Sequence, residues 1–284
     1  MPIHDSALLG ALERLQLRTR RPLAGLISGE HRSKRYGSSL DFADFREYQL
    51  GDDFRRIDYL TLARLDQLLI RLYEAEDDLV VRLVIDTSAS MGLDGKLRRA
   101  TELAAAIGFV SLTRRDVVSV HRLTGPPVRF SSRTAWPNLV RHLEGLRADG
   151  PASLMAASGE LLRRSGPNGL TVLLSDLLDP EWERALRRLP ARGADLAVVQ
   201  VLGRGELDPE VLGDVDLVDV ETGRRLPMSL TDGAIARYEA RRDEWLEQIA
   251  ARVAGLNAAY TMVPADADLR AVLLGSLRTG GLVS

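Results

Sequence analysis

The sequence predicts an α/β protein in which a mostly parallel sheet is flanked by helices. The chain has 284 residues, of which 45% are apolar, and this is enough to build a sizeable core. From Leu79 onward, aliphatic runs of strand length alternate with segments of helical spacing. Such alternation is typical of parallel sheets, because each return to a parallel strand needs a crossover, usually a helix. We therefore expect one α/β domain over residues 79–284 and an N-terminal extension over residues 1–78.

The elements follow from local spacing. After a first helix expected over residues 5–18, the predicted strands are Leu79–Ile85, Val117–Leu123, Val128–Phe130, Leu170–Leu174, Leu196–Leu202, Leu217–Val220 and Ala259–Val263. The predicted helices are Lys96–Leu112, Pro137–Leu146, Leu154–Arg164, Glu181–Leu189, Ala234–Ala254 and Ala267–Leu277. Leu79–Ile85 is a near-continuous aliphatic run, as expected of a strand buried on both faces, whereas Leu217–Val220 is expected at an edge. In the longest helix, Tyr238 and Trp245 are expected in the core.

Composition excludes several functions. The chain has no cysteine, which excludes disulfides and thiolate metal sites, and its four histidines form no HExxH motif. A net charge of -2 disfavours a nucleic-acid partner, because phosphate contacts need a surplus of positive charge. The longest nearly apolar stretch, Leu103–Leu112, is shorter than the ~20 residues of a membrane span, and no signal peptide is recognised. These features predict a cytoplasmic protein with no membrane span.

Hard oxygen donors follow two of the predicted strands. Asp86, Ser88 and Ser90 come directly after Leu79–Ile85, and Asp176 follows Leu170–Leu174. Because ligands of open α/β sheets collect at the carboxyl ends of strands, these side chains form a candidate site for Mg²⁺ or Mn²⁺. The alternative is a turn in which short polar side chains satisfy backbone groups before a helix.

The pattern Asp86-x-Ser88-x-Ser90 with a later Asp176 resembles the metal-ion-dependent adhesion site of von Willebrand factor A domains. The resemblance implies a Rossmann-type fold, a metal bound by these four residues, and an acidic side chain of a protein partner on the metal. That family also has a threonine in a later loop, where this chain reads Gly150-Pro151-Ala152-Ser153-Leu154. Ala152 falls at the threonine position, and Ser153 is a possible substitute one residue away.

A second motif lies upstream. Residues 41–74, including Tyr48-Gln49-Leu50-Gly51-Asp52 and Arg56-Ile57-Asp58-Tyr59, resemble a bacterial family, domain-of-unknown-function family 58. Tyr59 stands where that family usually has tryptophan. In that family this motif precedes an A-type domain, and members are commonly encoded beside MoxR-type AAA+ ATPases. The resemblance therefore implies a MoxR-type ATPase as partner.

Within this region, Asp44–Arg71 interleaves charged and aromatic residues and is called here the Arg-rich segment. Pairs between arginine and carboxylate groups would rigidify it against the sheet. Alternatively, it is a docking surface for the ATPase. The residues that would carry this docking are Arg46, Arg55, Arg56, Asp58 and Arg64.

Together these observations predict a non-enzymatic adaptor or co-chaperone that binds partners through the metal site. The alternative is a binding module with a vestigial metal site that docks through the Arg-rich segment. Enzymes are less favoured: the chain has no P-loop, and Ser88 stands where an aspartyl-phosphate loop needs an acid. A serine hydrolase with the order Ser, acid, His needs a late histidine, and none follows His142.

Overall fold

A computed structural model describes residues 5–18, 41–49, 52, 57–74, 79–148, 153–164, 169–190, 194–209 and 212–284. The chain divides into two compact units, one combining Met1–Thr19 with Leu79–Ser284 and the other formed within Arg20–Asp78. The boundary expected after residue 78 coincides with this division. The N-terminal helix α1 (Ser6–Leu12), however, belongs to the larger unit, because Leu8 and Leu12 are buried in its core. Residues 1–78 are therefore not one structural region.

The larger unit is built on a six-stranded sheet, which confirms the predicted α/β class. Its strands, in spatial order, are β10 (Ala259–Pro264), β7 (Asp195–Leu202), β6 (Leu170–Ser175), β3 (Val80–Ile85), β4 (Val117–Arg122) and β5 (Val128–Ser131). All neighbouring strands are parallel except β5, which pairs antiparallel with β4 through a short connection.

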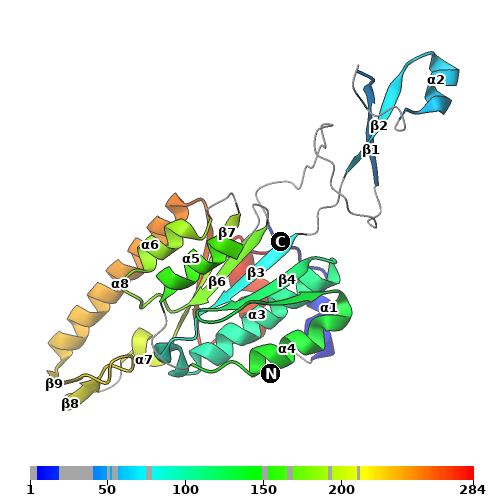
Figure 1. Ribbon diagram of the computed structural model, residues 1–284. Helices are drawn as coiled ribbons and strands as arrows, with labels where there is room; N and C mark the ends of the chain where they lie inside the picture. Colours follow the sequence, from blue (N-terminus) through cyan, green and yellow to red (C-terminus); the bar gives the residue numbers. More distant parts are fainter. Residues whose placement is uncertain are drawn as a thin grey trace. The chain divides into compact units, whose positions relative to one another are not determined.

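Helices cover both faces of this sheet (Figure 1). The helices of the unit are α1, α3 (Lys96–Thr113), α4 (Trp136–Glu144), α5 (Leu154–Arg164), α6 (Trp182–Arg188), α7 (Arg204–Leu207) and α8 (Asp232–Gly255), followed by the short α9 (Leu269–Ala271) and α10 (Leu277–Thr279). Single turns of 3₁₀-helix occur at η3 (Ala89–Gly92) and η4 (Arg133–Ala135), and a π-helical turn at η6 (Val272–Ser276).

Side chains alternate between the two faces of the sheet along each strand, and both faces are buried under helices. In β3, Leu83 and Ile85 point to the core shared with α1, α3 and α4, whereas Val84 points to the core shared with α5, α6 and α8. Successive side chains of a strand lie on opposite faces, so an uninterrupted aliphatic run is what a doubly covered strand requires. Helix α4 approaches α3 closely at Gly108, where a Cβ would lie 2.4 Å from the Leu139 side chain.

In the long helix α8, the expectation that Tyr238 and Trp245 both lie in the core is only half right. Ile249 and Val253 are fully buried and Trp245 packs against the same core, as its spacing predicted. Tyr238 is 42% exposed instead, because the first half of α8 extends beyond the sheet (Figure 1). Its hydroxyl donates a hydrogen bond to the backbone oxygen of Glu206 at 2.8 Å.

The expected edge strand over Leu217–Val220 is also corrected. Strands β8 (Gly213–Val218) and β9 (Arg225–Leu230) pair antiparallel with each other and form a hairpin apart from the six-stranded sheet. Both strands contain residues of low β-propensity, which explains why β9 is not evident from the sequence.

The described part of the smaller unit contains a strand pair and a helix. Its strands β1 (Asp41–Glu47) and β2 (Leu69–Glu74) form an antiparallel pair, and α2 (Tyr59–Leu65) lies between them in the chain. Asp58 caps the start of α2, and its carboxylate accepts hydrogen bonds from the Leu60 amide at 3.0 Å and the Thr61 hydroxyl at 3.1 Å. Among all the described helices of the chain, none combines the length and apolar character needed to cross a membrane.

Candidate cation and partner site

The candidate site lies where the strand order of the sheet reverses. The chain leaves β3 for β4 on one side and later returns to β6 on the other, so the carboxyl ends of β3 and β6 are adjacent. The Asp86 amide, just past β3, donates to the Leu174 oxygen in β6 at 2.9 Å. Such a reversal is where ligands of open α/β sheets bind. It brings the predicted site residues of both strands to one edge.

Asp86, Ser88 and Ser90 form a compact oxygen cluster. Ser88 donates to Asp86 Oδ1 from its amide at 2.9 Å and from its hydroxyl at 2.7 Å, and the Ser88 and Ser90 hydroxyls lie 3.1 Å apart. The hydroxyl of Ser175, at the end of β6, donates to Asp86 Oδ2. The bond from the Ser88 amide closes a tight turn ahead of η3, so the turn and the oxygen cluster are features of the same backbone.

The Asp86 carboxylate is buried, and no cationic side chain of the described residues pairs with it. It is only 2% exposed, and the groups that donate to it are the neutral Ser88 and Ser175. Burial raises the pKa of Asp86 above its ordinary value, against the hydrogen bonds from Ser175 and Ser88. A buried carboxylate is costly unless a positive charge compensates it, so this position favours a bound cation. The oxygens of one carboxylate and two hydroxyls suit a hard divalent ion.

Asp176 has a different partner from the one expected. Its Oδ2 accepts from Lys96 Nζ at 2.8 Å, and both side chains are fully buried. Lys96 also pairs with Glu206, whose Oε2 accepts from the Gly203 amide at 2.8 Å at the start of α7. Burial alone would lower the pKa of the Lys96 ammonium, but the carboxylates of Asp176 and Glu206 together raise it. Because Asp176 is already compensated by an ammonium, this arrangement does not support it as a metal ligand.

Lys96 is a site residue that sequence reasoning missed. One signal was present: only Lys34 and Lys96 are lysines among 38 basic residues, in a chain that otherwise uses arginine. A compact ammonium on a flexible stem fits a fully enclosed position where a broad, planar guanidinium does not. Lys34 lies outside the described residues, and Lys96 is fully buried and paired with Asp176.

A cavity of about 640 Å³ opens beside the cluster. Its lining residues come from the ends of β3 and β6, the start of α5 and the β8–β9 turn, and they are Asp86, Ser88, Ser90, Ser153, Leu178, Asp179, Pro180, Glu181, Asp219, Val220, Glu221 and Thr222. Ser153 thus reaches the same cavity, and its hydroxyl accepts from the Ala156 amide at 3.3 Å in the first turn of α5. Ala152 lies outside the described residues. Within the described ranges, no group of three or more His, Cys, Asp or Glu is placed to hold a metal, so a cation here would depend on the serine hydroxyls.

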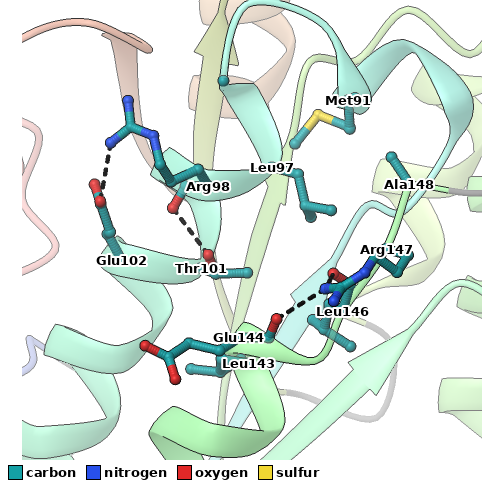
Figure 2. A pocket seen from close by; sticks show the side chains of 12 residues that line it. Met91, Leu97, Arg98, Thr101, Glu102, Leu143, Glu144, Leu146, Arg147 and Ala148 are labelled. Atoms are coloured by element: carbon teal, nitrogen blue, oxygen red, sulfur yellow. Dashed lines mark hydrogen bonds and ion pairs between the residues drawn. The ribbon is translucent and has the colours of Figure 1, made fainter. Parts of the chain in front are cut away.

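A second cavity of about 660 Å³ lies between α3 and the end of α4 and begins at Met91, directly after Ser90 (Figure 2). Leu97, Leu143 and Leu146 provide its apolar lining. At its rim, Arg98 pairs with Glu102 at 2.9 Å, and the Arg147 guanidinium donates to backbone oxygens, as Figure 2 shows. Its lining contains no histidine, and its one hydroxyl, that of Thr101, donates to the Arg98 backbone oxygen at 2.8 Å.

The Arg-rich segment shows internal pairing in its described part. Arg46 donates to both carboxylate oxygens of Asp52, at 2.9 and 3.0 Å, and Asp58 caps α2. Arg64 is exposed in the last turn of α2. Arg55 and Arg56 lie outside the described residues. Arg46 and Asp58 therefore have structural roles in their own unit.

The sequence matches a known family over most of its length. Residues 44–245 match the family described as "Protein of unknown function DUF58". The chain belongs to the DUF58 family. This DUF58 protein is 31% identical over 238 residues to the uncharacterized protein Rv1480 of Mycobacterium tuberculosis, and the match covers 78% of this chain and 73% of the relative. It has the same identity and coverage with the uncharacterized protein Mb1516 of Mycobacterium bovis.

Among solved structures, the DUF58 protein has a weak likeness to two proteins of Bacteroides. One is the conserved hypothetical protein BatB of Bacteroides thetaiotaomicron, with 12% identity, a TM-score of 0.41, and coverage of 71% of this chain and 98% of that chain. The other is an aerotolerance-related membrane protein of Bacteroides fragilis, with 15% identity, a TM-score of 0.42 and the same coverage. At this level of similarity, nothing about the function of those proteins transfers to the DUF58 protein.

Proposed function

We propose that this DUF58 protein is a non-enzymatic interaction module that binds an acidic side chain of a partner through a divalent cation. The cation would be held by Asp86, Ser88 and Ser90. The observation that carries the proposal is the buried Asp86 carboxylate, which has no ion-pair partner among the described residues and faces a cavity beside two hydroxyls. Mg²⁺ or Mn²⁺ suits this donor set, because both ions accept few carboxylates and keep other oxygen ligands.

Each residue of the cluster has a distinct role in this proposal. Asp86 supplies the negative charge, and Ser175 orients its carboxylate from the neighbouring strand. The Ser88 hydroxyl donates to Asp86 and lies 3.1 Å from the Ser90 hydroxyl, and both hydroxyls would turn their oxygens to the ion. When bound, the ion supplies a Lewis-acidic centre for a partner's carboxylate. Asp176 anchors the end of β6 through Lys96 and does not bind the ion.

The partner we propose is a MoxR-type AAA+ ATPase. Family membership supports it, because the sequence resemblance that implies this ATPase is to the same family. The carboxyl-end face supplies a cavity beside the polar cluster, and Leu178 adds apolar surface to its lining.

Catalytic alternatives find less support in the site. The residues that line the cavity include no histidine, so neither Ser88 nor Ser90 has the base that a serine hydrolase uses. Ser88 itself stands where phosphoryl transfer through Asp86 would need a second acid. The contacts of Arg46 and Asp58 do not favour docking through the Arg-rich segment, because both side chains form hydrogen bonds within their own unit.

This function is tested by comparing how tightly point variants and the native chain bind the partner. We expect Asp86→Ala, or addition of EDTA, to weaken binding of a purified MoxR-type ATPase by about tenfold or more, whereas Arg64→Ala changes it by less than about twofold. The measurement is biolayer interferometry in Mg²⁺ buffer. Unchanged binding by Asp86→Ala and in EDTA, together with loss in Arg64→Ala, would instead establish docking through the Arg-rich segment.

A further inference from the structure

The β8–β9 hairpin places an acidic side chain of this chain at the candidate site. Glu221 lies in the turn of the hairpin, and its Oε1 accepts a hydrogen bond from the Ser90 amide at 2.9 Å, although 131 residues separate the two. Ser90 is one of the three cluster residues. The hairpin turn, Asp219 to Thr222, also forms one wall of the cavity that Asp86, Ser88 and Ser90 line on the other side.

The turn holds Glu221 in a defined position. The Asp219 carboxylate accepts from the Glu221 amide at 2.9 Å and from the Thr222 hydroxyl at 2.6 Å. Gly223 closes the turn with a positive φ of 69°, and its amide donates to the Asp219 oxygen at 2.7 Å. These bonds fix the backbone on both sides of Glu221, so its side chain is directed by a formed turn.

The rest of the hairpin is loosely attached. Leu217 and Leu226, which pair across the two strands, are 44% and 54% exposed, and Met228 on the same face is 39% exposed. An isolated two-stranded hairpin has little stability of its own, so this hairpin depends on contacts such as the one between its turn and Ser90. The bond between Glu221 and the Ser90 amide is therefore a principal attachment of the turn to the site.

We propose that Glu221 is the chain's own occupant of the position that a partner's carboxylate takes, which makes the β8–β9 hairpin a displaceable cover of the site. This inference rests on the proposed function, because it assigns the position at which the partner binds. A carboxylate from outside must displace Glu221 from the Ser90 amide before it reaches the cluster. Binding therefore requires the hairpin turn to move away.

Three proteins test the inference: the native chain, Glu221→Ala, and Glu181→Ala as the matched control. Glu181 lines the same cavity, but its carboxylate pairs with Arg184 at 2.7 Å on the surface. The first readout is hydrogen exchange of the Ser90 amide in metal-free protein, measured by NMR. We expect exchange about tenfold or more faster in Glu221→Ala than in the other two, because the amide loses a hydrogen bond to a charged group.

The second readout is acetate, the smallest external carboxylate, titrated into Mn²⁺-loaded protein and followed by electron paramagnetic resonance. Acetate should bind Glu221→Ala about tenfold or more tightly than the native chain or Glu181→Ala, because the internal competitor is gone. Equal acetate affinity in all three proteins overturns the inference, as does equal Ser90 exchange. Faster Ser90 exchange in Glu221→Ala without Mn²⁺ binding in any of the proteins contradicts the proposed function, and leaves the hairpin as a cover of the cavity.

Discussion

Replacing Lys96 by methionine is expected to lower the free energy of unfolding by about 3–5 kcal/mol, because it leaves a buried carboxylate without its cation. Asp176 is 1% exposed, and its Oδ2 depends on the Lys96 ammonium at 2.8 Å. Methionine preserves much of the volume and the length of the side chain but carries no charge. Urea unfolding followed by circular dichroism measures the difference.

Two further variants separate this charge effect from a packing effect. Arg187→Met removes an exposed pair with Glu183 and should cost less than about 1 kcal/mol. Adding Asp176→Asn to Lys96→Met should restore much of the stability, because no uncompensated charge then remains at Asp176. A loss below about 1 kcal/mol for Lys96→Met, or a double variant no more stable than the single one, contradicts the assigned role of this pair.

The effect of Asp86→Asn on the free energy of unfolding is expected to depend on whether a divalent ion is present. In metal-free buffer, the variant should match or exceed the native chain in free energy of unfolding, because it removes a buried charge whose hydrogen-bond donors among the described residues are neutral. In Mg²⁺ at about 100 times its dissociation constant, the native chain should gain about 2.7 kcal/mol and the variant should gain almost nothing. Urea unfolding with and without Mg²⁺ measures both differences.

Asp94→Asn is the matched control for this prediction. Asp94 lies near the site on the connection between η3 and α3, but its carboxylate accepts from the Gly205 amide at 2.9 Å and does not line the cavity beside Asp86. This variant should keep the full Mg²⁺-dependent gain. The proposal fails here if Mg²⁺ stabilises Asp86→Asn as much as it stabilises the native chain.

The sequence was sufficient to predict the sheet and one half of the site. Aliphatic runs such as Leu170–Leu174 identify strands buried on both faces, and the structure contains each of them. Asp86, Ser88 and Ser90 lie close together because a single residue separates each from the next in one turn. Their position relative to β6 follows from parallel strands whose carboxyl ends share an edge.

Contacts between distant segments could not be predicted in this way. Lys96 reaches Asp176 across 80 residues, and Glu221 reaches Ser90 across 131, so no local period records either pair. The hairpin that carries Glu221 has weak strand signals: β8 contains Asp214 and Asp216, and β9 contains Pro227. Its pairing depends on the turn closed by Asp219, which spacing alone does not reveal.

The most direct test of the cation site is Mn²⁺ binding to EDTA-stripped protein, measured by electron paramagnetic resonance. The account predicts saturable binding of one Mn²⁺ per chain, lost in Asp86→Asn and kept in Asp94→Asn. Mg²⁺ should compete for the same site, because both are hard cations with similar oxygen ligands. Absence of saturable binding in the native chain, or equal binding by Asp86→Asn, would contradict the cation site at the centre of the proposed function.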